Sequence, residues 1–258
     1  MKIAILQMNS TLGEIKTNLE KIDAAATAAS NAGAELLICP ELAITGYGAG
    51  NDLRHGARKA DHEGLEDICA ISKKSGVAII TGYSEKTGTG YANSAVFIVD
   101  GDVKSNYQKC QLWGEYERQY FTAAQPSAVI ADYKGLRIGM LICYDVEFPE
   151  RVRALAKEGV DLIAVPTATP LGHAATFIAE KMLPVRAFEN QTHIAYVNHH
   201  SNDGRFDYAG LSCVAAPDGS HLVQAPPIGD ALLYADIDPQ KYAEFCKETP
   251  YLNDLVEG

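Results

Sequence analysis

The chain has 258 residues, which is enough to bury the core of one large domain. Its composition, 47% hydrophobic and 21% charged, is that of an ordinary globular protein. The net charge of -11 repels phosphate backbones and excludes nucleic acid as an expected partner. No stretch reaches the roughly 18 apolar residues of a membrane span, and residues 1–8 lack the features of a signal peptide. We therefore expect a cytoplasmic protein with no membrane partner.

Short apolar runs alternate with segments of helical pattern along the whole chain. The apolar runs predict strands at 2–8, 35–39, 77–82, 93–99, 103–107, 136–143, 161–165, 193–198, 211–215 and 231–236. Helices are predicted at 18–32, 65–75, 149–158, 174–190 and 239–247. Thr17 and Glu20 resemble a capping box before the first helix, Gly33 ends that helix, and Pro184 disturbs the fourth. This alternation predicts one α/β domain over residues 1–258.

Two parts of the sequence resemble each other. Residues 32–40, Ala-Gly-Ala-Glu-Leu-Leu-Ile-Cys-Pro, match residues 158–166, Glu-Gly-Val-Asp-Leu-Ile-Ala-Val-Pro, in residue type, and so do the strands predicted before them. Either the chain contains two strand–helix–strand units that pack as a pseudo-symmetric pair, or buried strands resemble each other by chance. The first interpretation places Glu41 and Cys143 just after the carboxyl ends of parallel strands, where open α/β sheets bind ligands.

Glu41 directly follows a predicted buried strand and a proline, in the segment Pro-Glu-Leu-Ala-Ile-Thr-Gly-Tyr. Burial there would raise the pKa of its carboxyl group and suit it to general-base catalysis. The alternative is a carboxylate that caps a helix or a turn. The glycine-rich segment 46–51 that follows is expected to form either a mobile mouth of a pocket or a plain turn.

Lys109 and Glu117 lie in a second segment of interest, after the strand predicted at 103–107. An ammonium group held away from water at the end of that strand could stabilise an oxyanion. The alternatives are a surface lysine and, for Glu117 in a charged loop, a solvated salt-bridge partner.

Cys143 ends a predicted strand, and a helix is expected to start at Pro149. This is the pattern of a nucleophile elbow, in which a sharp turn presents the side chain and adjacent backbone N–H groups bind an oxyanion. A nearby helix N-terminus would lower the pKa of the thiol. The alternative is a buried structural cysteine, which is our expectation for the other five. All six are expected to be reduced, because they are scattered and form no Cys-x-x-Cys pair.

Together these segments resemble the catalytic motifs of the nitrilase superfamily of carbon–nitrogen hydrolases. The resemblance rests on Pro-Glu-Leu-x-x-Thr-Gly-Tyr around Glu41, Tyr-x-Lys-x-x-Leu around Lys109, and Cys-Tyr-Asp-x-x-Phe-Pro-Glu from Cys143. Their order and spacing match the family, with Glu117 at its interval after the lysine, and the likeness runs from residue 2 to about residue 236.

The resemblance implies a four-layer αββα sandwich, commonly paired into homodimers, and a Glu-Lys-Cys triad with a second glutamate beside it. It implies hydrolysis of a small carboxamide through a cysteine thioester; Tyr144-Asp145, where true nitrilases tend to carry Trp-Glu, favours the amidase-like branch. Activity on a nitrile or an N-carbamoyl amino acid is the alternative within the family, and a catalytically silent binding protein is the alternative outside it. Gln111 is a departure, because many relatives have histidine there.

The residues that flank these motifs are predicted to bind a small amide substrate. Most are aromatic, which favours a small or medium apolar acyl group. They are Tyr47, Trp113, Tyr144, Glu147, Phe148, Thr167 and Ala168. No cofactor or metal is expected, since there is no glycine-rich phosphate loop and the group His193, His199 and His200, with Asp203 and Asp207, matches no zinc spacing.

Overall fold

The structure is a computed structural model that describes residues 1–256, so the last two residues of the predicted domain lie outside it. The strands are β1 (Lys2–Gln7), β2 (Leu36–Ile38), β3 (Ala78–Lys86), β4 (Tyr91–Val99), β5 (Asp102–Gln108), β6 (Ile130–Tyr133), β7 (Leu136–Met140), β8 (Leu162–Pro166), β9 (His193–Val197), β10 (His200–Asn202), β11 (Asp207–Ala209), β12 (Cys213–Ala215), β13 (His221–Gln224) and β14 (Ala231–Asp236). The helices are α1 (Ile15–Asn31), α2 (Asp52–His55), α3 (Glu66–Ser75), α4 (Gly114–Tyr120), α5 (Pro149–Lys157), α6 (His173–Phe177), α7 (Leu183–Asn190) and α8 (Ala243–Glu248).

Of the strands in residues 1–256, β10 and β11 form a two-stranded sheet, and the others form two six-stranded sheets with the same pattern of pairing. The first is β14-β1-β2-β3-β4-β5 and the second, read from its other edge, is β6-β7-β8-β9-β12-β13. In each sheet three consecutive parallel strands lie between one antiparallel edge strand and two further antiparallel strands. The internal resemblance in the sequence therefore reflects two pseudo-symmetric units and not chance.

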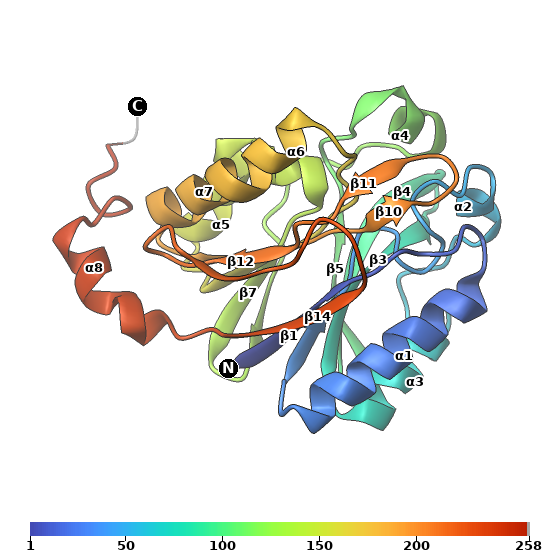
Figure 1. Cartoon of the computed structure of the whole chain (residues 1–258), viewed down its shortest axis with the longest axis horizontal. Coiled ribbons are helices and arrows are strands. Elements are labelled where there is room, and N and C mark those ends of the chain that lie inside the picture. The colour runs from blue at the N-terminus through green and yellow to red at the C-terminus, as the bar shows by residue number, and fades with distance from the viewer. Residues whose placement is uncertain (257–258) are drawn as a thin grey trace.

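The two sheets pack face to face, and each outer face is covered by helices (Figure 1). Helices α1 and α3 pack together over the first sheet, and α5 and α7 pack together over the second. Contacts of β1 with β9 and of β3 with β8 join the sheets. This is the four-layer αββα sandwich that the resemblance implied.

Strand β1 shows how the sequence produces this layering. Ile3 and Ile5 belong to the hydrophobic core that includes the residues between the two sheets, while Ala4 and Leu6 pack in a second core with α1 and α3. Successive side chains of a strand point to opposite faces, so a continuous apolar run is buried on both. Each fully buried Ile contributes about 1.5–3 kcal/mol.

Several predicted boundaries are wrong. Helix α1 begins at Ile15, so Thr17 lies inside it and is no cap; Gly33 follows the helix at φ +72°, as expected. The strand predicted through residue 143 ends at Met140, and a 3-10 turn, Cys143–Glu147, follows.

The helix predicted at 174–190 is divided in the structure. A π-helical turn, Ile178–Met182, separates α6 from α7 just before Pro184. Proline lacks the N–H that would bond back along the helix, so the regular pattern is disturbed there. Within residues 1–256 no helix combines the length and the apolar character needed to cross a membrane.

Gly82 on β3 allows the Glu41 segment to approach the sheet closely. A Cβ atom at Gly82 would lie 2.3 Å from the Leu42 nitrogen, 2.6 Å from the Glu41 Cα and 2.7 Å from the Pro40 oxygen. The Gly82 N–H also donates to that oxygen at 3.1 Å. All three close atoms are backbone, so no side-chain rotation can relieve the overlap.

We predict that Gly82→Ala destabilises the fold by about 1–3 kcal/mol, the usual cost of overpacking a filled interior. Urea denaturation followed by circular dichroism measures this free energy of unfolding. The matched control is Gly88→Ala, because nothing lies within 4 Å of a Cβ atom at that position. Equal denaturation midpoints for the two variants would contradict the prediction.

Candidate active site

Glu41 lies after the end of β2 and is fully buried. Its Oε1 atom accepts hydrogen bonds from Lys109 Nζ and Asn93 Nδ2, each at 2.7 Å. Its Oε2 atom accepts none within residues 1–256. Burial raises the pKa of Glu41 to about 7, although the Lys109 ammonium opposes the shift. One carboxylate oxygen is thus anchored, and the other is available to take a proton.

Lys109 follows β5 and is fully buried, so the alternative of a surface lysine is wrong. Its ammonium group lies 2.7 Å from Glu41 Oε1 and 2.6 Å from Glu117 Oε1. Burial alone would lower the pKa of Lys109, but the Glu117 and Glu41 carboxylates outweigh burial and hold it well above its usual range. Lys109 is therefore a permanent cation between two carboxylates.

Glu117 lies on helix α4 and not in a loop, and it is buried, so the alternative of a solvated salt bridge is also wrong. Its Oε1 atom accepts from Lys109 Nζ and from the Tyr47 hydroxyl at 2.8 Å, and its Oε2 atom accepts from the Trp113 N–H at 3.0 Å. Both oxygens are engaged. Glu117 is suited to holding Lys109 in place and not to transferring protons.

Cys143 is the first residue of the 3-10 turn after β7, at φ +46°, in the left-handed region that non-glycine residues rarely adopt. Such backbone strain clusters at functional sites. Its Sγ atom lies 3.6 Å from Thr169 Oγ1. Burial, reinforced by the Glu41 carboxylate, raises the pKa of the thiol, so the expected lowering by a helix N-terminus is wrong. The resting thiol stays protonated and needs a base.

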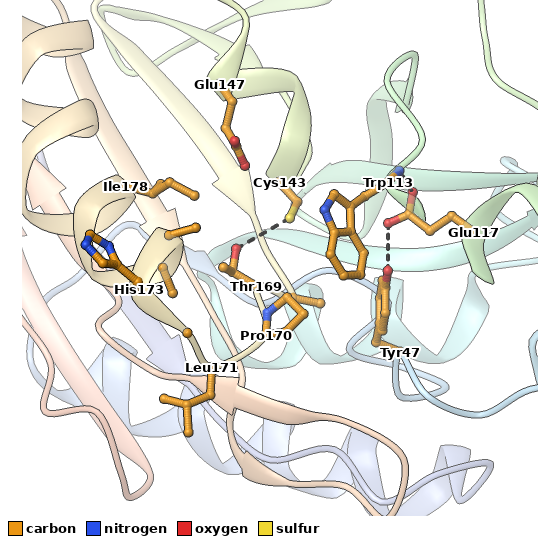
Figure 2. A pocket seen from close by; sticks show the side chains of 14 residues that line it. Tyr47, Trp113, Glu117, Cys143, Glu147, Thr169, Pro170, Leu171, His173 and Ile178 are labelled. Atoms are coloured by element: carbon orange, nitrogen blue, oxygen red, sulfur yellow. Dashed lines mark hydrogen bonds between the residues drawn. The ribbon is translucent and has the colours of Figure 1, made fainter. Parts of the chain in front are cut away.

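A cavity of about 270 Å³ opens onto Cys143 (Figure 2). Of the predicted binding residues, Tyr47, Trp113, Glu147 and Ala168 line it, together with Glu117. The Tyr47 hydroxyl donates a hydrogen bond to Glu117 at one side of the cavity, and the Trp113 ring lies beside Cys143. The volume is at the lower end for ligand pockets and fits a small molecule.

Tyr144, Phe148 and Thr167 do not line the cavity, contrary to prediction. The Tyr144 ring packs edge-on against Phe148, with centroids 4.9 Å apart. The Thr167 hydroxyl turns back to the Val165 carbonyl at 2.9 Å. Gln111 does not line the cavity either, so its side chain does not set the polarity of the cavity. Its backbone N–H donates to Asp145.

The far wall of the cavity was predicted only in part from the sequence. It comes from the loop after β8 and from α6, and its residues are Thr169, Pro170, Leu171, Gly172, His173, Ala174, Ala175 and Ile178. Thr169 also contacts the Tyr196 hydroxyl, and its backbone N–H donates to Asn198 Oδ1 at 2.9 Å. The segment 165–170, which follows the strand predicted at 161–165, is typical of a pocket-lining loop, and Thr169 and Pro170 confirm that interpretation. Helix α6 carries no chemical motif and was not predicted to line the cavity.

Comparison with known proteins places this site in a family. The carbon-nitrogen hydrolase family model matches residues 2–247. The chain belongs to the carbon–nitrogen hydrolase family. Among its relatives, a Pseudomonas protegens protein called hydrolase in pqqF 5'region is 34% identical over 98% of this chain and 88% of its own. An (R)-stereoselective amidase from Pseudomonas sp. is 30% identical over 87% of this chain and 81% of its own.

A solved structure of an amidase from Nesterenkonia sp. is similar throughout. It shares 31% identity with this carbon–nitrogen hydrolase, with a TM-score of 0.86 over 99% of this chain and 93% of its own. Another form of that amidase carries the acetamide moiety of fluoroacetamide added covalently at its active-site cysteine. A further form is a complex with butyramide.

In this carbon–nitrogen hydrolase, the described residues contain no group of three or more His, Cys, Asp or Glu side chains arranged to hold a metal ion. The buried His199 instead contacts two backbone oxygens, with Nδ1 3.1 Å from that of Met8 and Nε2 2.7 Å from that of Glu41. His199 thus ties the Glu41 segment to the chain after β9.

Asp145, for which the sequence predicted no role in the site, connects the cysteine turn to the lysine segment. Its buried carboxylate accepts from the backbone N–H groups of Ile142 at 3.1 Å and Gln111 at 2.8 Å. It also accepts from the Tyr107 hydroxyl at 3.0 Å and from Cys110 Sγ at 3.3 Å. These bonds fix the position of Cys143 relative to Lys109.

We predict that Asp145→Asn lowers the free energy of unfolding by about 1–3 kcal/mol, because the amide nitrogen faces donors and leaves them unsatisfied. Chemical denaturation measures the change. Asp132→Asn is the control, since the Asp132 side chain is 84% exposed. Wild-type stability of the Asp145 variant would show that these hydrogen bonds contribute nothing.

Proposed function

We propose that this chain hydrolyses small carboxamides to a carboxylate and ammonia, with Cys143 as nucleophile. The observation that carries the proposal is the buried Glu41–Lys109–Glu117 network beside a cavity-lining thiol. The acetamide adduct on the active-site cysteine of the Nesterenkonia amidase supports a nucleophilic cysteine at this position.

The charges of the network explain how a protonated thiol is activated. Lys109 carries one positive charge and is bonded to two carboxylates, of which it can neutralise only one. Glu117 has both oxygens occupied, whereas Glu41 has one free oxygen. The excess negative charge is therefore best relieved when Glu41 takes up a proton.

In the acylation step, Glu41 takes the proton of Cys143 as the sulfur attacks the amide carbon. The carbonyl oxygen becomes an oxyanion, stabilised by the Lys109 ammonium and the backbone N–H of Tyr144 in the first turn after the strand. As the intermediate collapses, the carbon–nitrogen bond breaks and protonated Glu41 gives its proton to the nitrogen. Ammonia leaves, and a thioester remains on Cys143.

In the deacylation step, Glu41 takes a proton from water, and the resulting hydroxide attacks the thioester carbon. The carbon–sulfur bond breaks, the thiolate regains the proton from Glu41, and the carboxylic acid product leaves and loses its proton to water. Glu117 positions Lys109 in both steps. The titrations of Glu41 and Cys143 are linked, because the Glu41 carboxylate raises the pKa of the Cys143 thiol.

The nucleophile is tested with amides, nitriles and N-carbamoyl amino acids of matched size, assayed for ammonia release. We expect turnover of amides by the wild type and a loss of at least about 10³-fold in Cys143→Ala. Mass spectrometry after acid quench should show an acyl adduct on Cys143 in the wild type alone. If only nitriles were turned over, the substrate would be a nitrile and not an amide. If Cys143→Ala hydrolysed amides at the native rate, Cys143 would not be the nucleophile.

The base is tested by the pH dependence of kcat/KM. Glu41 must be ionised to accept the thiol proton, and burial raises its pKa to about 7. We therefore expect kcat/KM to rise with pH and level off above about pH 7, with a tenfold loss per unit well below it. A profile that is flat from about pH 5 to pH 8 would contradict a base with a raised pKa, since a carboxylate of ordinary pKa would already be ionised over that range.

Homodimer formation and a cytoplasmic location, expected from the resemblance and the composition, stay predictions.

A further inference from the structure

Glu147 is a lining carboxylate that the mechanism does not use. It ends the 3-10 turn that Cys143 begins, and Figure 2 shows its carboxylate pointing into the cavity between Ile178 and Cys143. The side chain is half-buried, and burial raises its pKa. Within residues 1–256, no group donates a hydrogen bond to this carboxylate and no cation forms an ion pair with it.

In the described part of the chain, no lysine or arginine that lines the cavity pairs with Glu147, although the nearby Lys109 and Arg186 cations oppose the rise in its pKa. Of the lining residues in the described chain, the acidic ones are Glu117 and Glu147, and none is a lysine or an arginine. Glu117 is paired with Lys109. Arg186 lies close to Glu147, but its guanidinium bonds the backbone oxygen of that residue at 2.9 Å and the Glu189 carboxylate at 3.0 Å.

The orientation of a bound amide follows from the proposed function, on which this inference rests. With the carbonyl oxygen at Lys109 and the nitrogen at Glu41, the acyl chain extends from Cys143 into the remaining part of the cavity. That part is lined by Glu147 and by the apolar side chains of Ala175 and Ile178. A short chain therefore runs over apolar surface and ends near a carboxylate.

We propose that the site selects carboxamides whose acyl chain ends in an ammonium group, which Glu147 binds. The methylene groups of such a chain pack against the apolar side chains of Ala175 and Ile178. The ammonium group donates the hydrogen bonds that the Glu147 carboxylate lacks. An acyl chain that ends in a carboxylate is repelled by Glu147. The net charge of -11 acts in the same direction by attracting cations.

The test uses three amides of nearly equal length: 4-aminobutanamide, which is cationic, pentanamide, which is neutral, and glutaric acid monoamide, which is anionic. At about pH 7.5 the amine is charged. We expect the wild-type kcat/KM for 4-aminobutanamide to exceed that for pentanamide by about tenfold or more, the usual scale of a charge-assisted hydrogen bond. Glutaric acid monoamide should be the poorest substrate.

Glu147→Gln is expected to bring the ratio between 4-aminobutanamide and pentanamide close to one, and Glu147→Asp, which keeps the charge, to restore part of it. The matched control is Glu150→Gln, an exposed carboxylate on α5 that does not line the cavity, and it should keep the wild-type ratio. An unchanged ratio in Glu147→Gln, or a wild-type preference for pentanamide or the anionic amide, would overturn the proposal.

Calorimetry separates this inference from the proposed function. If no amide is hydrolysed, the proposed function fails, and binding of the same three compounds to the wild-type protein still tests Glu147. Tighter binding of 4-aminobutanamide that is lost in Glu147→Gln supports the cation site. Equal binding of 4-aminobutanamide and pentanamide contradicts it, even if all three amides are hydrolysed.

Discussion

The whole site depends on one buried cation held between two carboxylates. Removing an ammonium from water costs several kcal/mol, and Lys109 is fully buried. That cost is offset only because Glu41 and Glu117 lie within hydrogen-bond distance. The ends of β2 and β5 and the helix α4 must therefore meet at one point. The same pairing leaves one negative charge in excess, and this excess suits Glu41 to the proposed role of base for a thiol that burial keeps protonated.

The pseudo-symmetric pair of sheets brings these elements together. The ends of β2 and β8 occupy equivalent positions in the two sheets, and they are joined directly by the hydrogen bond from the Glu41 N–H to the Thr167 oxygen at 3.3 Å. Cys143 follows β7, the neighbour of β8. The base and the nucleophile thus come from different sheets, and the packing of one sheet on the other sets the distance between them. Gly82, which has no side chain, lets the Glu41 segment lie close against β3 of its own sheet.

The sequence predicted the chemical residues better than the walls of the cavity. The motifs predicted the position of the chemical residues, because each of these residues follows a strand end or lies at a fixed interval from one. They are Glu41, Lys109, Glu117 and Cys143. The cysteine turn was harder, because a strand was predicted through residue 143 and a strand alternates its side chains in twos. The structure has a 3-10 turn there instead, in which Glu147 lines the cavity with Cys143 while Tyr144 packs on Phe148. Ile178 reaches the cavity only through the packing of α6 and its π-helical turn, for which no local pattern exists.

The two acidic residues of the cavity show how hydrogen-bond satisfaction separates structural from ligand-binding roles. Both line the same space as Cys143. The oxygens of Glu117 accept three hydrogen bonds from protein groups, so a substrate has little to offer them. Those of Glu147 accept none from the described residues, and its partial burial leaves it only partly hydrated. A charge that the protein leaves unpaired next to its own nucleophile is stabilised most by a ligand of opposite charge, and only while that ligand is bound. The same carboxylate that is costly in the empty cavity is therefore the group that distinguishes one acyl chain from another.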